Sequence, residues 1–153
     1  FDRTNTSKSL LKALKKNRNE SVLWLNGDVV FDEKILEIFE PHIKENVSFV
    51  AVNTSKVAEE EVKYTLKNNF ILKLSKEVSG GLGEAVGINF ISSNDIDNFI
   101  SRLEECDDND YFERGLELAI EKDGIKVKAV DISAFNCMEI DFLDDLEKVN
   151  KML

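Results

Sequence analysis

The sequence predicts an α/β fold with a mostly parallel sheet and helices on both of its faces. Short apolar runs alternate along the chain with segments whose apolar residues recur at helical spacing. Several runs, such as 22–25 and 49–52, are apolar at every position. Such runs are typical of strands that are buried on both faces of a parallel sheet. A small antiparallel hairpin is expected beside the main sheet.

Length and composition predict one domain that spans residues 1–153, because the chain has a single proline and no linker or repeat. The formal net charge of -10 argues against binding to a nucleic-acid polymer, whose phosphates an acidic surface repels. No apolar run approaches the roughly 20 residues needed to cross a bilayer. Two distant cysteines and one histidine argue against a zinc site or a disulfide scaffold, and predict a reduced, cytoplasmic protein.

The first third of the chain predicts two helices and a strand. A helix is expected through residues 10–16. Its candidate N-caps are Thr4, Thr6 and Ser7. The run VLWL is expected to form a buried strand that ends near Asp28. Asp32 is expected to cap the next helix, and Pro41 to disturb its end.

The remaining two-thirds continue the alternation of strands and helices. SFVAVN reads as a second buried strand, and EVKYTLKNNFILKL predicts a hairpin over 62–74 that turns near Asn68 and Asn69. A strand follows the glycine-rich stretch 80–87. Two helical patterns, the strands IKVKAVDI and CMEI, and the helical segment DFLDDLEKVNKML complete the chain. Gly124 is expected to end the second of the two helices.

Asp28 stands out because it is a carboxylate at the end of an otherwise apolar strand. In open α/β sheets, ligands bind beyond the carboxyl ends of strands. A carboxylate there suits a metal that carries nucleotide phosphates, and Gly27 lets the backbone approach a ligand closely. An aspartate that begins an ordinary turn would look the same in the sequence, so both interpretations stay open.

The segment CMEIDFLDDL contains a second carboxylate at a strand end. Glu139 and Asp141 flank Ile140, so on a strand they share one face. Asp141 also precedes the final helix and is a candidate for its N-cap. Two strand-end aspartates that are distant in the sequence, Asp28 and Asp141, are what a shared Mg²⁺ site would require.

Five segments, in order along almost the whole chain, resemble the sugar-phosphate and phosphocholine-type nucleotidyltransferases. RTNTSKSL looks like the family's RTNNxxSL, and LWLNGDVVFDEKIL is similar to LLLNGDVxFDxxLL. EVKYTL and KLSKE resemble the family's hairpin. GEAVGINFIS looks like GExxGIxxFS, and MEIDFLDDLEKV is similar to xEIDTPEDLxxA. The chain departs from the family at Phe142 and Leu143, where Thr-Pro is usual.

The resemblance implies a Rossmann-like fold of the nucleotide-diphospho-sugar transferase type, with Mg²⁺ as the cofactor. The residues that it implies are Asp28 and Asp141 for the metal, Lys63 and Lys76 for catalysis near the phosphates, and Glu84, Asn26 and Gly27 for substrate binding. Simpler interpretations remain for several of these side chains. Hairpin lysines often only keep an edge strand soluble, and a glutamate in a glycine-rich loop is often simply solvated. Trp24 is expected in the core and His42 at the surface.

The implied reaction is Mg²⁺-dependent transfer of a nucleoside monophosphate from a nucleoside triphosphate to a small phosphorylated acceptor, with release of pyrophosphate. The GExxGI and EID elements favour CTP and phosphocholine over a sugar 1-phosphate. The alternatives are a sugar-1-phosphate nucleotidyltransferase and a non-catalytic nucleotide-binding domain or fragment. A glycosyltransferase is a further alternative, although it normally carries a DxD pair and the chain has Asn26-Gly27-Asp28 instead. Neither a nucleic-acid polymer nor a membrane is an expected partner.

The family's glycine-rich signature loop has no counterpart in residues 1–27. The glycines of 80–87 do not replace it, because they lead into a strand and not into a helix N-terminus. The sequence also opens at Phe1 without a methionine. We therefore expect a nucleotidyltransferase-like domain truncated at its N-terminus. Alone, it should be catalytically poor and should self-associate or pair with the missing N-terminal portion, because absent strands leave apolar surface exposed.

Overall fold

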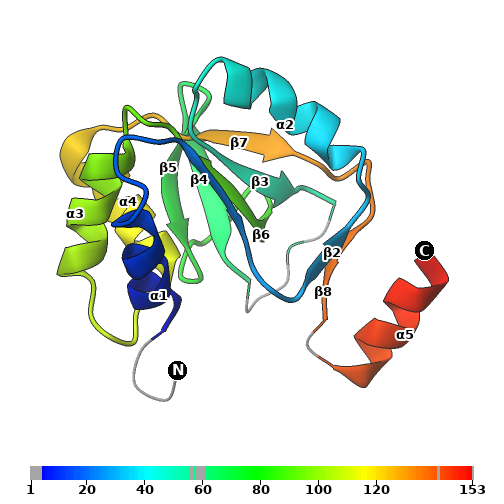
Figure 1. Cartoon of the computed structure of the whole chain (residues 1–153). Coiled ribbons are helices and arrows are strands. Elements are labelled where there is room, and N and C mark those ends of the chain that lie inside the picture. The colour runs from blue at the N-terminus through cyan, green and yellow to red at the C-terminus, as the bar shows by residue number, and fades with distance from the viewer. Residues whose placement is uncertain (1–4, 56, 58–60, 141, 153) are drawn as a thin grey trace.

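A computed structural model describes residues 5–55, 57, 61–140 and 142–152, and Figure 1 shows its alternating helices and strands. The helices are α1 (Thr6–Leu14), α2 (Ile35–Lys44), α3 (Ile96–Glu105), α4 (Phe112–Asp123) and α5 (Leu143–Met152). The strands are β1 (Val22–Leu25), β2 (Val29–Phe31), β3 (Phe49–Asn53), β4 (Lys63–Lys67), β5 (Phe70–Ser75), β6 (Glu84–Ile91), β7 (Lys128–Asp131) and β8 (Cys137–Glu139). The predicted α/β class is confirmed.

The central sheet has six strands in the order β5-β4-β6-β3-β7, with β1 also paired to β6. Strand β6 runs antiparallel to β1, β3 and β4, so these three strands share one direction, and β7 joins β3 in parallel. Most strands therefore point the same way, as predicted. Most hydrogen-bonded neighbours are nevertheless antiparallel, because β6 lies between strands of the opposite direction.

Helices cover both faces of this sheet, as predicted. Phe49 of β3 packs with Phe39 of α2 in one buried cluster. The next residue, Val50, belongs to a second cluster with α1, α3 and α4. Successive side chains of a strand point to opposite faces, so a strand that is apolar throughout requires cover on both. Figure 1 shows α2 above the sheet and α1, α3 and α4 together on the other side.

The predicted hairpin is confirmed as β4 and β5, which pair antiparallel. Asn68 and Asn69 form its turn, with φ angles of 52° and 66°. Two consecutive positive φ angles fit a two-residue turn whose twist matches that of the flanking strands, and asparagine tolerates this region better than most residues.

The structure confirms one predicted helix end and corrects another. Asn5 caps α1, because its backbone is extended and its side chain accepts a hydrogen bond from Thr6 N at 2.8 Å. Thr6 and Ser7 instead lie inside the helix, and Thr4 is outside the described residues. Gly124 ends α4 in the left-handed region with φ of 69°, as predicted.

Helix α2 differs from its prediction at both ends. Asp32 accepts a hydrogen bond from Lys34 N at 3.0 Å, but Lys34 itself occupies the cap position. Pro41 lies inside the helix without ending it, since helix α2 continues to Lys44. His42, predicted to lie at the surface, is half-buried, so this prediction is only partly correct. Its ring packs 5.8 Å from the Phe49 ring, and burial lowers its pKa, because α2 lies directly on the sheet.

Strands β2 and β8 form a second, two-stranded sheet, which leads into α5. Figure 1 shows α5 standing apart from the helices that cover the central sheet. Among the helices of the described residues, none is long and apolar enough to span a bilayer.

Candidate active site

The turn after β1 carries Asn26, Gly27 and Asp28. Asn26 N donates to Gly87 O at 2.9 Å, which ties the turn to β6, and Val29 N donates to Asn26 O at 3.4 Å. A Cβ built on Gly27 would meet nothing within 4 Å, so this position leaves open space beside the turn. Asp28 is therefore a turn residue and is also exposed next to open space, and the two interpretations of its sequence position are compatible.

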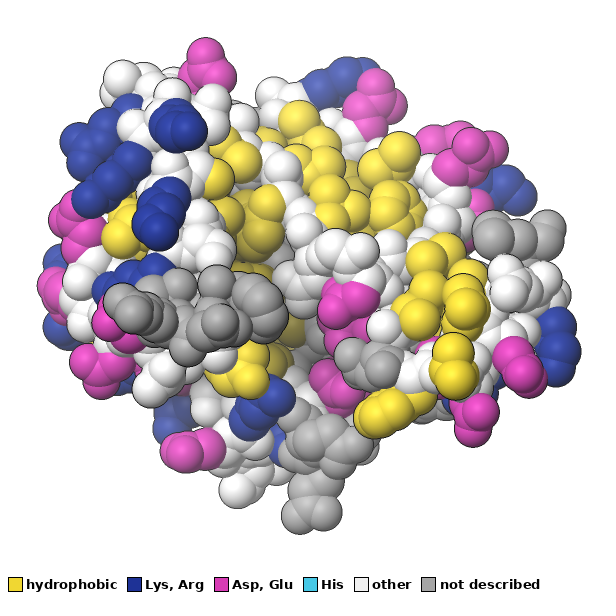
Figure 2. All heavy atoms as spheres, turned by 60° about the horizontal axis from the view of Figure 1, so that its bottom comes forward, with side chains coloured by type: hydrophobic (Ala, Val, Ile, Leu, Met, Phe, Trp, Pro, Cys, Tyr) yellow, Lys and Arg dark blue, Asp and Glu magenta, His cyan; other side chains and the backbone are white. Residues whose placement is uncertain are grey.

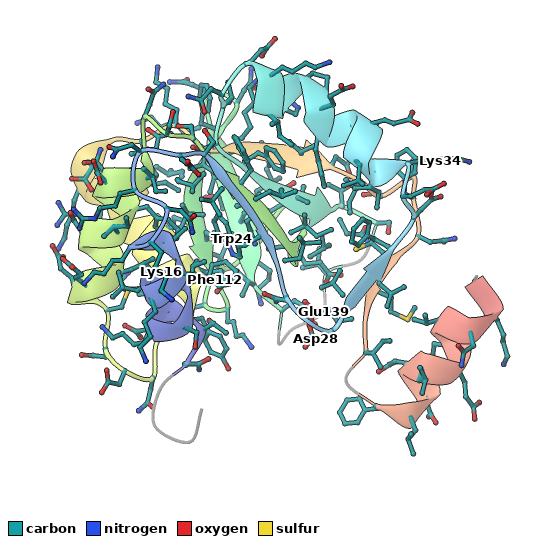
Figure 3. The ribbon with its side chains drawn as sticks, viewed as in Figure 1. Lys16, Trp24, Asp28, Lys34, Phe112 and Glu139 are labelled. Carbon is teal, nitrogen blue, oxygen red and sulfur yellow. The ribbon has the colours of Figure 1, made fainter. Side chains whose placement is uncertain are left out.

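The small β2–β8 sheet brings Glu139 beside this turn. Val29 and Glu139 are register partners, and Ile140 N donates to Asp28 O at 2.9 Å. The side chain of Asn26 donates from Nδ2 to Glu139 Oε1 at 3.4 Å, across 113 positions of sequence. Figure 3 shows Asp28 and Glu139 close together at the bottom of the molecule. Asp141, the second predicted metal ligand, lies outside the described residues.

Gly87 of β6 allows this close approach. Its φ is +70°, and a Cβ at this position would lie 2.8 Å from Asn26 Nδ2 and 3.0 Å from Glu139 Oε1. A side chain here would displace the pair. In the sequence, Gly87 is a single glycine within an otherwise apolar strand. Such a glycine often marks a place where another group approaches the backbone closely.

A cavity of about 640 Å³ opens beside the turn, within the size range of small-molecule sites. Of the predicted residues, it is lined by Asn26, Gly27, Asp28 and Lys76. Glu139 also lines it. Figure 2 shows acidic side chains among apolar ones near the centre of this face. The structure thus brings four predicted site residues to one cavity.

Glu84 and Lys63 lie at a neighbouring position. They are register partners on β6 and β4. Glu84 lines a second cavity of about 450 Å³, and Glu61 and Glu139 line both this cavity and the first. Glu139 therefore lies between the cavity of Asp28 and Lys76 and the cavity of Glu84, whereas Lys63 lines neither of them.

The start of α4 contributes side chains that the sequence analysis did not assign to the site. Tyr111, Phe112 and Glu113 all line the first cavity. Lys76 Nζ lies 5.0 Å from the centroid of the Tyr111 ring, a cation–π distance. In the sequence, these residues appear as two aromatic residues followed by a glutamate at the start of a helix. Many amphipathic helices begin in this way, so the pattern did not identify site residues.

Glu113 has an unusual environment within the described residues. The residue as a whole is half-buried, but its Oε2 is buried and has no hydrogen-bond partner there. Burial raises the pKa of Glu113 to about 7, while its own backbone N–H lowers the pKa, the charge of Glu139 raises it further and Lys76 lowers it. Desolvation disfavours the charged form of a carboxyl, which is the cause of the main shift.

Trp24 combines the predicted core position with a place at the cavity. Its ring stacks on Phe99 at 5.7 Å and meets Phe112 edge-on at 5.5 Å. It also lines the cavity, and Figure 3 shows it next to Phe112. The core prediction was therefore correct but incomplete, because a residue at the rim of a core can also face a ligand site.

The donor atoms at the turn fit a hard divalent cation. Mg²⁺ prefers oxygen ligands and is usually held by one or two carboxylates, with substrate phosphates and waters completing its shell. Asp28 and Glu139 supply carboxylates of this kind. Among the described residues, which do not include Asp141, no group of three or more His, Cys, Asp or Glu is placed to hold a metal ion.

Solved structures share this arrangement of strands and helices. The inositol-1-phosphate CTP transferase from T. maritima superposes with a TM-score of 0.78 at 18% identity, covering 98% of this chain and 61% of that one. The CTP:phosphocholine cytidylyltransferase from Streptococcus pneumoniae gives 0.76 at 13% identity, covering 99% and 64%. The chain has the nucleotidyltransferase fold. A UTP-bound UGPase from Acinetobacter baumannii gives 0.68 at 12% identity, covering 95% and 55%.

This chain spans less than two-thirds of the length of each of these structures. No protein-family model matches the sequence, and a search of curated proteins found no match. At such low identities the likeness establishes the fold. The roles of individual residues in this nucleotidyltransferase fold therefore rest on geometry and chemistry.

Proposed function

We propose that the protein containing this chain transfers a nucleoside monophosphate from a nucleoside triphosphate, with CTP as the donor, to a small phosphorylated acceptor such as phosphocholine. The observation that carries the proposal is the meeting of two distant segments. The Asn26–Asp28 turn contacts Glu139 and Ile140 beside a cavity that Lys76 also lines.

The reaction requires positioning and charge neutralisation more than a strong base. An ionised phosphate oxygen of the acceptor attacks the α-phosphorus of the triphosphate in line. The new phosphorus–oxygen bond forms as the bond to the β-phosphate bridging oxygen breaks, and pyrophosphate leaves with that electron pair. No proton needs to be removed from the acceptor, which fits a cavity whose lining contains no histidine.

Each side chain has a distinct task in this proposal. Asp28 and Asp141 hold Mg²⁺, which when bound neutralises phosphate charge. Lys76 at the first cavity and Lys63 on β4 interact electrostatically with the phosphates. Asn26 and Gly27 shape the turn against the substrate, and Asn26 also orients Glu139 through its hydrogen bond. Glu84 contacts the acceptor from the neighbouring cavity.

The choice of acceptor has support in the charge of the first cavity. Four acidic residues, Asp28, Glu61, Glu113 and Glu139, line it with one basic residue, Lys76, among the described residues. Aromatic walls complete the lining. An acceptor that carries an organic cation fits such a lining better than a neutral sugar does. Two of the compared structures are named for CTP, which supports the choice of donor.

The proposal is tested by measuring pyrophosphate release from the product of the reading frame that contains these residues. The assay combines Mg²⁺ and four nucleoside triphosphates with phosphocholine, other small phosphorylated molecules and sugar 1-phosphates. One donor–acceptor pair should give release, and Asp28→Asn and Asp141→Asn should reduce it by about 10²-fold or more, the scale expected when charge stabilisation is lost from a transition state. Asp97→Asn, an exposed aspartate on α3, is the matched control and should leave the rate unchanged.

Two other results would redirect the proposal. Release with sugar 1-phosphates alone would make the protein a sugar-1-phosphate nucleotidyltransferase. A folded protein that binds a nucleotide but releases no pyrophosphate with any pair would be a non-catalytic binding domain, and Asp28 would then be only a turn residue.

We also propose that the 153-residue chain by itself is a poor catalyst that self-associates or pairs with an N-terminal portion. Among the described residues, β1 pairs with β6 and has no strand on its other edge. Leu25 of β1 and Leu143 of α5 are 40% and 81% exposed. Unpaired strand edges and exposed apolar side chains favour association. Light scattering after gel filtration should show oligomers, and a monomer with robust turnover would contradict this expectation.

A further inference from the structure

Helix α5 leaves apolar side chains exposed within the described part of the chain. Phe142, Leu143 and Leu146 are 75%, 81% and 42% exposed. Val149 of the same helix is 2% exposed, so α5 does pack on the molecule, but through its other face. Figure 1 shows α5 apart from the helices that cover the central sheet, and Figure 2 shows apolar side chains gathered on that side of the molecule. An exposed apolar patch of this kind marks an interaction surface.

The exposed residues of α5 form one stripe along the helix. They recur at intervals of three and four positions, which places them on a single face: Leu143, Leu146, Glu147 and Asn150. Asp145 and Val149, one turn apart, lie on another face and are more buried. The outward stripe is therefore apolar toward the start of α5 and polar beyond it.

The charged residues of α5 are also ordered along the helix. Its acidic residues all precede its basic ones, in the order Asp144, Asp145, Glu147, Lys148 and Lys151. Lys148 Nζ pairs with Asp145 Oδ1 of the same helix at 2.9 Å. Asp144, Glu147 and Lys151 take part in no ion pair among the described residues. One end of the helix thus offers negative charge to a partner, and the other end offers positive charge.

We propose that α5 is the interface between two copies of this chain, which pack their α5 helices antiparallel about a two-fold axis near residues 147 and 148. Antiparallel packing places the acidic half of one helix beside the basic half of the other, so Asp144 meets the partner's Lys151. Parallel packing would place like charges together, which is unfavourable. The charge order therefore selects the arrangement that a two-fold axis generates, in which each contact occurs twice.

The apolar residues of the stripe supply the centre of this interface. An α-helix rises about 1.5 Å per residue, so the Leu146 side chains of the two copies lie roughly 4.5 Å apart along the helices and contact each other across the axis. Phe142 and Leu143 cover the last turn of the opposite helix. Exposed ion pairs alone contribute little to association, and burial of these apolar side chains is the main driving force. A second copy is the partner that fits, because one helix carries both the apolar stripe and the complementary charges.

Sedimentation of the product of the reading frame over a wide range of concentrations tests the proposal. It should show a monomer–dimer equilibrium, because a two-fold interface closes on itself. Leu143→Gln and Leu146→Gln retain a good helix former and should each weaken the dimer at least about tenfold, since each change occurs twice in the interface. Leu72→Gln is the matched control and should leave the dimer unchanged. Leu72 is 45% exposed, but it lies on β5, at the other side of the molecule from α5.

Reversal of single charges gives the sharpest result. Asp144→Lys places two basic residues together at each end of the helix pair, and Lys151→Asp places two acidic ones there. At low salt each variant alone should dimerise about tenfold more weakly than the unchanged protein. An equimolar mixture of the two variants should regain most of the affinity, because a basic helix then meets an acidic one at both ends. Recovery in the mixture also shows that neither change has unfolded α5.

Three results would overturn the proposal. A folded product of the reading frame that stays monomeric would mean that other parts of that product cover α5. A dimer that Leu143→Gln and Leu146→Gln leave unchanged would use another surface, such as the edge of β1. A mixture that associates no better than its two components would reject the antiparallel charge pairing. Pyrophosphate release in the same samples is a separate measurement, so the interface and the proposed reaction can each be rejected alone.

Discussion

Strands β1 and β3 are alike in sequence and different in the folded molecule. VLWL and FVAV are both apolar at every position. The first four residues of β3 are fully buried, whereas those of β1 are half-buried or exposed. The reason is their neighbours, since β3 lies between β6 and β7 and β1 is paired with β6 alone among the described strands. The comparison shows that an apolar strand can serve either as core or as the wall of a site.

The largest expected difference is in stability. Phe49 of β3 is fully buried against Phe39 and Phe90. Phe49→Ala should lower the free energy of unfolding by about 3–5 kcal/mol, through lost burial and the cavity left behind. Leu25→Ala in β1 should cost less than about 1 kcal/mol, because this side chain is 40% exposed already. Urea unfolding of both variants checks the comparison, and equal costs would show that β1 is also covered in solution.

The second expected effect is a pH dependence of the free energy of unfolding, caused by Glu113 in the wall of the first cavity. The pKa of Glu113 is raised from 4.5 to about 7 in the folded protein, so the folded state holds this proton more tightly than the unfolded chain does. Its contribution to stability is fully present below about pH 4.5 and is lost as the pH rises through about 7. The loss from this residue is at most roughly 3 kcal/mol.

The variant Glu113→Gln should therefore show a smaller decrease in the free energy of unfolding between pH 5 and 8 than the unchanged protein. Urea unfolding at a series of pH values measures it, with Glu37→Gln as the control that retains the full decrease. Identical pH profiles for Glu113→Gln and the unchanged protein would mean that the carboxyl is well solvated.

The third comparison is between two glycines, one at the site and one away from it. Gly87 and Gly80 have nearly the same positive φ, +70° and +66°, but a Cβ at Gly80 would meet only open space. Both Gly→Ala variants should lose about 1–2 kcal/mol from the strained backbone. Only Gly87→Ala should also push apart Asn26 and Glu139, whose side-chain ends lie within 3.0 Å of the added atom.

Pyrophosphate release should consequently fall in Gly87→Ala and persist in Gly80→Ala. The shift of the Asn26 side-chain amide in NMR spectra reports the displacement directly, without need of turnover. If the two variants behaved alike in both measurements, the pairing of Asn26 with Glu139 would have no importance for the site.

Much of the fold followed from local pattern. The apolar runs predicted strands β1 and β3, although only β3 is buried as expected. Asn68 and Asn69 predicted the hairpin turn, and Gly124 predicted the end of α4. These features depend on neighbours in sequence, on alternation and on backbone preferences, which a single chain displays directly. The departures from prediction at Asp32, Pro41 and His42 all lie around helix α2, which packs on the sheet.

Some features of the candidate site could likewise be predicted from the sequence, and others could not. The sequence by itself determined that Asp28 ends a strand after a glycine, and which residues resemble a nucleotidyltransferase motif. Only the tertiary structure decided that Glu139 meets Asn26, that Lys76 lies on Tyr111, and that Glu113 has a buried oxygen without a partner among the described residues. These contacts join residues that are distant in the chain. Their distances and desolvation exist only after β2 has paired with β8 and α4 has packed beside β5, and no local pattern records them.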